Sequence, residues 1–335
     1  MQAPRTWTAN ALLELGRSYQ PAAIFAAAAD LELFDLVSGG SLTAKEVARK
    51  LQCEVRGVLI LLDSLVSLQL LRKRGTSYFM PPGTAAFRSA DSPESILAMA
   101  QHQANCLRNW VQLAKVVKMG RPAEKLPSVR GAEGDATAFI GAMHNVSVPI
   151  ADKVIKTLAP FRFTHLLDIG GASGTWTVAF LRACPSAQAT LFDLPHVISM
   201  ARQRLEDAQL LDRVRLVAGD FMMDGLPGGA DLAWVSAIVH QNSREQNRTL
   251  FTKVYQSLTP GGRVAIRDIL MDESRSKPPA GALFAVNMLV ATEGGGTFTF
   301  GELREDLADS GFIKPSVVRR DEGMNSIVVA RKPVR

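Results

Sequence analysis

The sequence predicts an α/β protein of two domains, in which an all-helical domain precedes a doubly wound, mostly parallel sheet. Three observations support this prediction. The 335 residues are more than most single domains contain. The first 118 residues place apolar side chains at three- and four-residue spacings, which is typical of amphipathic helices. From Phe139 onward, short apolar runs alternate with segments of helix length, which is typical of βαβ units.

The first domain is expected to have a winged-helix pattern. Thr43 stands three residues before Glu46, the spacing of a capping box at the start of a helix. A second, largely aliphatic helix follows from Glu54 to Leu71, and Arg72 to Phe79 then forms a short hairpin with basic residues. Helices are expected at residues 8–18, 21–37, 43–51, 54–71 and 93–118.

The second domain is expected to begin after a loop that is rich in glycine, proline and charge. The predicted boundaries are 1–118 for the helical domain, 119–138 for the linker and 139–335 for the sheet domain. A hairpin without an intervening helix should close the sheet with an antiparallel strand at or near its edge. Strands are expected at 165–169, 189–192, 214–217, 232–238, 263–269, 315–319 and 326–330.

Composition excludes several classes of protein. Hydrophobic residues make up 47% of the chain and charged residues 21%, which excludes a disordered or low-complexity chain. The longest apolar run, Ala22 to Ala29, is too short for a membrane helix, and the first residues lack a signal-peptide pattern. Cys53, Cys106 and Cys184 have neither disulfide nor zinc spacing. We therefore expect a reduced, cytoplasmic protein without a structural metal or a membrane partner.

A glycine-rich turn directly follows the first predicted strand of the sheet. The segment Leu166 to Gly174 contains Asp168, Gly170 and Gly171 between a buried strand and a helix. Ligands of such sheets bind at the carboxyl ends of the strands, where glycine lets them approach the backbone. A purely structural turn is the alternative for these residues.

Acidic residues follow the next two strands. Asp193, followed by Leu194, ends the second strand and can accept both hydroxyl hydrogens of a ribose. Asp220 and Phe221 follow the third strand, where a carboxylate can accept from an exocyclic amine and a ring can cover adenine. A helix cap at Asp193 and a turn at Asp220 are the structural alternatives. Three such features on successive strand ends favour a nucleoside-bearing cofactor.

The choice of cofactor lies between a nicotinamide dinucleotide and S-adenosylmethionine. The dinucleotide spacing Gly-x-Gly-x-x-Gly is not met, since position 172 is alanine. Asp168, two residues before the first glycine, suits a cofactor with a cationic amino group and no pyrophosphate. The residues therefore favour S-adenosylmethionine, which would leave as S-adenosylhomocysteine.

These motifs, with Pro260-Gly261-Gly262 and the run Asn287 to Gly295, resemble the class I O-methyltransferases that include caffeic acid and acetylserotonin O-methyltransferases. The resemblance covers nearly the whole chain. It implies a Rossmann-like methyltransferase sheet, an amino-terminal dimerisation domain, and cofactor contacts at Gly170, Asp193, Asp220 and Phe221. The chain departs from the family at Ala172, where a glycine is common, and at Ser236, where plant members have a lysine that helps to bind the cofactor.

His240 is the candidate general base, because it follows the fourth predicted strand at the same edge of the sheet. A phenol is mostly protonated near neutral pH, whereas an imidazole is mostly free base and can accept its proton. A lone histidine here could instead be structural. By the resemblance, His240 aligns with the family's base and Asp268 with one of its two supporting acids. Thr297 stands in place of the second acid, so we expect either a weaker base or an acceptor more acidic than a simple phenol.

The resemblance also implies an acceptor pocket for a small, aromatic hydroxyl compound. Its expected lining comprises Met143, His144, Asn287 and Met288, with His144 a second candidate base or donor. The methionines are equally consistent with plain core packing. Methylation of carbon or nitrogen, or use of the site without methylation, remains an alternative on the same fold.

A winged-helix DNA-binding regulator is the alternative from another class, suggested by the net charge of +6. The helix at 54–71 argues against it, because it carries few groups that could contact bases or phosphates and is expected to be buried. The segment 21–29, which is rich in small and apolar residues, instead favours contact with a second subunit. We therefore expect a homodimer without a nucleic-acid partner.

Overall fold

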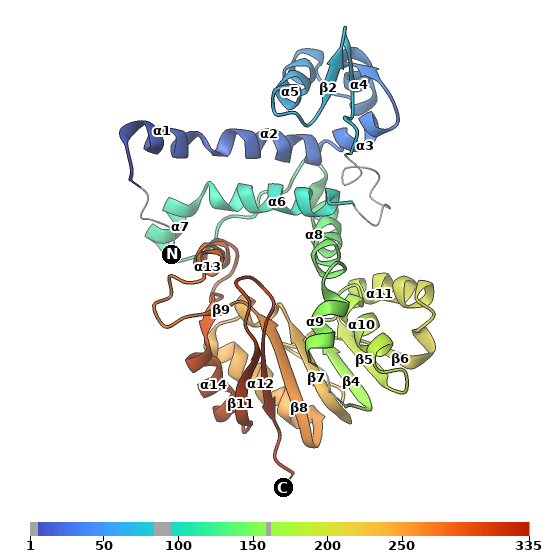
Figure 1. Ribbon diagram of the computed structural model, residues 1–335, viewed down its shortest axis with the longest axis vertical. Coiled ribbons are helices and arrows are strands. Elements are labelled where there is room, and N and C mark those ends of the chain that lie inside the picture. The colour runs from blue at the N-terminus through green and yellow to red at the C-terminus, as the bar shows by residue number, and fades with distance from the viewer. Residues whose placement is uncertain (1–5, 84–94, 159–161, 335) are drawn as a thin grey trace. The chain divides into compact units, whose positions relative to one another are not determined.

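The computed structural model describes residues 6–83, 95–158 and 162–334. The chain forms two compact units and crosses between them three times (Figure 1). The predicted boundaries near 118 and 139 fall between these crossings. The first unit contains Met1–Arg108 and Lys125–Asn145, and the second contains Asn109–Glu124 and Val146–Arg335.

Helices dominate the first unit, as the periodicity predicts. The capping box is confirmed, since Thr43 accepts from the Glu46 N–H and the Glu46 carboxylate accepts from the Thr43 N–H. The helix expected at 21–37 is interrupted at Glu32, whose backbone is left-handed at a φ of 55°. The helices that lie in or enter this unit are α1 (Ala9–Arg17), α2 (Tyr19–Asp30), α3 (Leu33–Ser38), α4 (Ala44–Leu51), α5 (Val55–Ser67), α6 (Leu97–Trp110) and α8 (Gly131–Ser147). Helix α8 therefore begins within the expected linker.

The predicted hairpin is present and forms the wing of a winged-helix arrangement. Strands β2 (Arg72–Arg74) and β3 (Ser77–Phe79) pair antiparallel, and β1 (Leu42–Thr43) adds to the other side of β3. Helix α5 is buried on one face only. Val58, Leu62 and Leu65 are buried, whereas Val55, Leu59 and Ile60 are exposed. The expectation that this helix is buried therefore holds for one side only. That side packs into the hydrophobic core of the first unit, and the other side is exposed.

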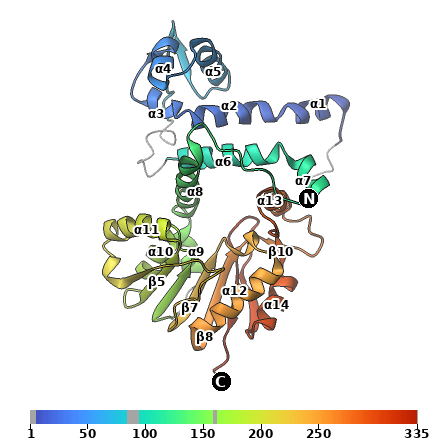
Figure 2. The ribbon, with the colours of Figure 1, turned by 180° about the vertical axis from the view of Figure 1, so that it is seen from behind.

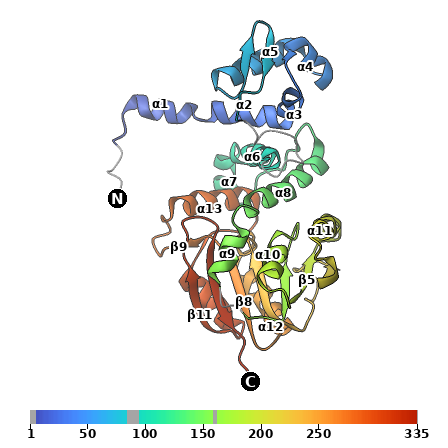
Figure 3. The ribbon, with the colours of Figure 1, turned by 45° about the vertical axis from the view of Figure 1, so that its right-hand side comes forward.

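Helix α1 has no buried residue among those that the structure describes. It extends beyond the compact group formed by α3, α4 and α5 (Figures 1 and 3). Leu12, Leu13 and Leu15 are each more than half exposed, at 52%, 57% and 54%. An apolar surface of this kind is typical of a contact with another chain.

A seven-stranded sheet forms the centre of the second unit, in the order β11-β12-β8-β7-β4-β5-β6. Strand β12 runs antiparallel to both its neighbours, as the closing hairpin predicts, and β11 lies at the edge. The bounds are β4 (His165–Ile169), β5 (Gln188–Asp193), β6 (Val214–Ala218), β7 (Ala230–Ser236), β8 (Leu258–Asp268), β11 (Ile313–Arg319) and β12 (Ser326–Arg331). Strand β7 ends two residues earlier than expected, and β8 begins five residues earlier.

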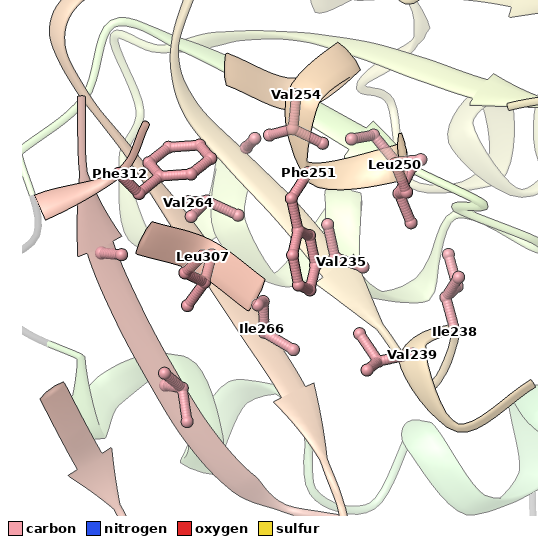
Figure 4. Close-up of a cluster of buried hydrophobic side chains, with 14 of the residues drawn as sticks. Val235, Ile238, Val239, Leu250, Phe251, Val254, Val264, Ile266, Leu307 and Phe312 are labelled. Carbon is pink, nitrogen blue, oxygen red and sulfur yellow. The ribbon is translucent and has the colours of Figure 1, made fainter. Parts of the chain in front are cut away.

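Helices cover both faces of this sheet, which makes it doubly wound. One core contains side chains of α12 (Arg244–Ser257) and α14 (Phe300–Asp309), including Phe251 and Leu307 against Val235 and Ile266 (Figures 2 and 4). The other core contains side chains of α9 (Ala151–Thr157), α10 (Thr175–Ala183) and α11 (Pro195–Asp207). The two cores fix the strand ends that carry the candidate site.

Helix α13 (Pro279–Ala291) is attached to the segment 109–124, which includes α7 (Leu113–Met119). The Ala123 N–H donates to the Val290 carbonyl at 2.9 Å. Helix α13 also lies beside β9 (Leu270–Met271), which pairs parallel with β10 (Phe298–Thr299) (Figures 1 and 3). This attachment places the segment 109–124 within the second unit.

Candidate active site

The glycine turn after β4 has no room for side chains at its first positions. Gly170 has a φ of 62°, and a Cβ there would lie 2.6 Å from the Ile238 side chain. Its N–H donates to the Phe192 carbonyl of β5 at 2.8 Å. The turn therefore packs closely against the side chains around the sheet, at positions where only glycine fits.

Asp168 lies beneath this turn and is almost wholly buried, with 1% of its surface exposed. The Thr177 hydroxyl of α10 donates to its Oδ2 at 2.6 Å. Burial raises the pKa of Asp168 from 3.8 to about 7, mainly because an ionised carboxylate loses its hydration there. Asp168 thus lies behind the glycine turn and is hydrogen-bonded to Thr177 of α10.

Asp193 joins the glycine turn to the end of β5. Its Oδ2 accepts from the Ala172 N–H and its Oδ1 from the Leu194 N–H, both at 2.7 Å. Burial raises the pKa of this carboxyl, although the two backbone N–H groups oppose that effect. Each carboxylate oxygen can accept a second hydrogen bond, so Asp193 retains two acceptor positions for a ribose. The residues present therefore fit a nucleoside.

Asp220 and Phe221 follow β6, as expected. Asp220 Oδ1 accepts from the Met222 N–H at 2.8 Å, which leaves Oδ2 without a protein donor among the described residues. The Phe221 ring lies 3.8 Å from the position of a Cβ on Gly170. The turn after β6 thus adjoins the glycine turn, as the strand-end rule predicts.

Ser236, at the end of β7, is held by a buried arginine. Arg267 Nη1 donates to the Ser236 hydroxyl oxygen at 3.0 Å, and Arg267 Nε donates to Asn325 Oδ1 at 2.9 Å. The guanidinium also lies 4.5 Å from the Trp176 ring centroid. Burial lowers the pKa of Arg267 to about 10. The positively charged Arg267 of β8 is therefore bonded to Ser236, the position at which plant members of the family that the sequence resembles carry a lysine.

His240 and Asp268 form a buried pair. His240 lies in the 3₁₀ turn η3 (Val239–Gln241), and its Nδ1 is 2.9 Å and 3.0 Å from the two Asp268 oxygens. The Ile269 N–H donates to Asp268 Oδ1 at 2.8 Å, and the His240 N–H donates to Oδ2 at 3.2 Å. These backbone bonds orient the carboxylate toward the ring. His240 Nε2 has no hydrogen-bond partner in the described part of the chain.

Helix α13 and the residues after it surround His240. The Phe284 ring packs edge-on against the imidazole, with centroids 4.9 Å apart. The Gly296 N–H donates to the His240 carbonyl at 2.9 Å. Thr297, which follows, is buried and carries no charge. Asp268 is thus the acidic residue that is hydrogen-bonded to His240.

The expected acceptor residues divide between the two units. Asn287 and the buried Met288 lie on α13 in the second unit, and the Trp110 indole N–H donates to Asn287 Oδ1 at 2.9 Å. Met143 and His144 lie half-buried on α8 in the first unit. Their role in acceptor binding remains a prediction.

Four neighbours of the expected residues are absent from the predicted site: Thr177, Arg267, Phe284 and Trp110. Thr177 lies on the helix after the glycine turn, and Arg267 immediately precedes Asp268. Their places in the sequence could have suggested these two residues as candidates, although not the bonds that they form. Trp110 lies 177 positions from Asn287, so only the fold could reveal that contact. No group of metal-ligating side chains occurs among the described residues.

The fold and this edge of the sheet fit an enzyme of the class that binds a nucleoside-bearing cofactor at the strand ends. Comparison with known families identifies it further, since residues 110–312 match the O-methyltransferase domain and residues 14–84 match the O-methyltransferase dimerisation domain. The chain belongs to the O-methyltransferase family, and S-adenosylmethionine is its methyl donor. Both the resemblance and the cofactor expected from the sequence are confirmed.

Individual relatives cover almost the whole chain. The tetracenomycin polyketide synthesis 8-O-methyl transferase TcmO of Streptomyces glaucescens is 28% identical over 96% of this chain and 96% of its own. Acetylserotonin O-methyltransferase of Gallus gallus is 30% identical over 91% of this chain and 92% of its own. The structure of human N-acetylserotonin methyltransferase in complex with S-adenosylmethionine matches with a TM-score of 0.82 and 25% identity, over 99% of this chain and 100% of that chain.

Proposed function

We propose that this O-methyltransferase methylates a hydroxyl group of a small aromatic compound, with His240 as the general base. The His240–Asp268 pair carries this proposal, because Nδ1 bonds to the carboxylate while Nε2 is left to accept a proton. A carboxylate at Nδ1 favours the tautomer with a free Nε2 and stabilises the imidazolium that forms.

The residues of the chain have separable roles in this reaction. His240 removes the hydroxyl proton of the acceptor at Nε2, and Asp268 holds the ring during that transfer. Phe284 covers one side of the imidazole and limits the access of water. S-adenosylmethionine, when bound, supplies the methyl group on a sulfonium sulfur. Placement of the acceptor oxygen in line with that methyl group contributes much of the rate.

We assign the cofactor to the glycine turn and the two acidic strand ends. Asp193 would accept from the ribose hydroxyls beside Gly170 and Leu194. Asp220 would accept from the adenine amine, and Phe221 would cover the ring. Ser236 would donate its hydroxyl hydrogen, since Arg267 already occupies the oxygen as an acceptor. Asp168 supports the turn from below and favours a cationic amino group when ionised.

An aromatic acceptor is supported by the relatives and by the apolar surroundings of His240. The Streptomyces glaucescens relative is a transferase of tetracenomycin polyketide synthesis and the chicken relative acts on acetylserotonin. Near His240, Phe284 offers apolar surface, and Asn287, three residues further along α13, offers a polar anchor, which suits a flat molecule with few polar groups. Met143 and His144 would complete the lining.

This function is tested by incubating the purified enzyme with isotopically labelled S-adenosylmethionine and a panel of hydroxylated arenes. We expect products heavier by one CH2 unit, with the new methyl carbon bonded to oxygen by NMR. Methyl groups on carbon or nitrogen would instead support the alternatives considered from the sequence. Absence of transfer to every hydroxyarene would contradict the proposal.

We also propose a cytoplasmic homodimer. The match to a dimerisation domain and the exposed leucines of α1 support self-association. Cys53 and Cys106 are in no disulfide within the described ranges, which is consistent with a reducing compartment. No helix in the described ranges is long and apolar enough to cross a membrane.

A further inference from the structure

Trp110 and Asn287 form a fixed contact beside the candidate acceptor site. The indole Nε1 donates to Asn287 Oδ1 at 2.9 Å. Residues 109–124, which begin beside Trp110, are attached to α13 again at their other end, where the Ala123 N–H donates to the Val290 carbonyl at 2.9 Å. The two bonds tie both ends of this segment to α13.

This contact determines which end of the Asn287 amide remains available. An indole N–H can only donate, so the atom of Asn287 that faces it must be the carbonyl oxygen. Rotation of the amide by half a turn would set two donors against each other. The amide nitrogen of Asn287 has no protein partner among the described residues, and the side chain is half-buried. Asn287 therefore presents its two amide N–H donors, and its oxygen, which keeps one lone pair, faces the indole.

The available donors lie near the candidate base. Phe284, whose ring contacts the His240 imidazole, precedes Asn287 by three residues on α13. Residues three apart share one side of a helix. The Gly296 N–H bond to the His240 carbonyl ties the chain after α13 to the same turn. A molecule that presents a hydroxyl to His240 thus has Asn287 within its surroundings.

We propose that Trp110 is a positioning residue that commits Asn287 to donating, and that the acceptor is a hydroxyarene whose ring system carries a conjugated carbonyl. This inference rests on the proposed function. The carbonyl oxygen would accept from the Asn287 amide while the hydroxyl faces His240.

The acidic partners of His240 support the same class of acceptor. Asp268 is the only carboxylate paired with the base among the described residues, and the buried Thr297, which follows the Gly296 bonded to the His240 carbonyl, is neutral. A carbonyl conjugated with a phenol stabilises the phenolate, because the negative charge spreads onto the carbonyl oxygen. Such a hydroxyl needs less help from the base. The amide donors of Asn287 and the single acidic partner of His240 therefore both favour a hydroxyarene with a conjugated carbonyl.

The test compares two probes that differ only at the carbonyl, 7-hydroxychroman-4-one and 7-hydroxychroman. The kcat/KM of methyl transfer is measured for both between pH 6 and pH 9, so that the acidity of the hydroxyl separates from recognition. We expect wild-type enzyme to prefer the chromanone. Trp110→Phe should reduce that preference about tenfold, mainly through KM, because about 1.4 kcal/mol of hydrogen bonding corresponds to a factor of ten.

Further variants separate positioning from general damage. Trp110→His, which retains a donor, should recover part of the preference, and Asn287→Asp, which cannot donate, should abolish it. Val111→Ala alters a neighbouring side chain that is 73% exposed and should leave the preference unchanged. If Trp110→Phe does not fold, the preference measured for Asn287→Asp tests the inference in its place.

Binding of both probes to enzyme loaded with S-adenosylhomocysteine provides a readout that does not need turnover. The chromanone should bind more tightly, and Trp110→Phe should remove the difference. Equal use and binding of the two probes by wild-type enzyme, or an unchanged preference in Trp110→Phe, would overturn this inference while methyl transfer itself upholds the proposed function. Absence of transfer to any hydroxyarene would overturn both.

Discussion

The Thr177 hydroxyl donates a hydrogen bond of 2.6 Å to Asp168 beneath the glycine turn. Because burial raises the pKa of this carboxyl from 3.8 to about 7, the folded protein holds its proton at pH values where the unfolded chain has lost it. The associated stability is complete below about pH 4 and is lost as the pH rises through about 7.

Asp168→Asn should remove this pH dependence. Asparagine can still accept from Thr177 and does not ionise. Between pH 4 and pH 8, the free energy of unfolding of the wild type should fall relative to the variant by at most a few kcal/mol. Urea denaturation at several pH values measures this difference. Parallel stability curves for the two proteins would contradict the burial argument.

His240→Ala should abolish most turnover without affecting the cofactor. Loss of a general base lowers kcat about 10²- to 10⁴-fold. Calorimetry should show little change in affinity for S-adenosylhomocysteine, because the proposed ribose and adenine contacts lie at the ends of β5 and β6, whereas His240 follows β7. Glu245→Ala, an exposed change on α12, provides a control with normal turnover. Wild-type rates in His240→Ala would remove the base assignment.

Asp268→Asn tests whether the carboxylate sets the histidine tautomer. An asparagine amide can donate to Nδ1, which would place the imidazole proton on Nε2 and block proton removal. Turnover should fall about 10²-fold or more. The double variant with His240→Ala should be little worse than His240→Ala alone, since the two residues act as a unit. Independent, multiplying losses would show that Asp268 acts elsewhere.

Asp193→Ala should weaken the cofactor site directly and through the turn. The change removes two backbone hydrogen bonds of 2.7 Å as well as the proposed ribose acceptors. We expect affinity for S-adenosylhomocysteine to fall about tenfold or more, since each lost hydrogen bond to a charged group costs about 1.5–3 kcal/mol. Asp207→Ala, at the far end of α11, should retain wild-type affinity. Equal affinities in the two variants would reject this role.

Leu12→Asp together with Leu13→Asp should dissociate the proposed dimer. Both leucines are more than half exposed on α1, and burial of charge in an apolar interface is unfavourable. Sedimentation should find a dimer for the wild type at micromolar concentration and a monomer for the variant. A wild-type monomer under these conditions would refute self-association.

The sequence predicted the sheet well because its strands are apolar, separated by helices and followed by characteristic turns. The strand at His165–Ile169 and the capping box at Thr43 match the structure residue by residue. The interruption at Glu32 was not predictable from periodicity, because apolar spacing continues across it. One left-handed residue redirects the chain there.

The candidate site was predictable where strand ends bring residues together. The proximity of the Asp193 carboxylate to the glycine turn, and of Asp268 to His240, follows from parallel strands. Contacts that depend on tertiary packing were not predictable. The Arg267–Ser236 bond needs the register of β7 and β8, and the Trp110–Asn287 bond needs the path of a segment far away in sequence.

Ala172 has a left-handed backbone with a φ of 46°, where relatives of the resembled family commonly have glycine. An alanine in this conformation costs about 1–2 kcal/mol in the folded state. It also restricts the unfolded chain, which returns about 0.4–1 kcal/mol. The folded-state cost exceeds the gain, so Ala172→Gly should stabilise the protein by about 1 kcal/mol. The wild-type turn thus carries conformational strain beside the proposed cofactor site, and an engineer can release it with one substitution.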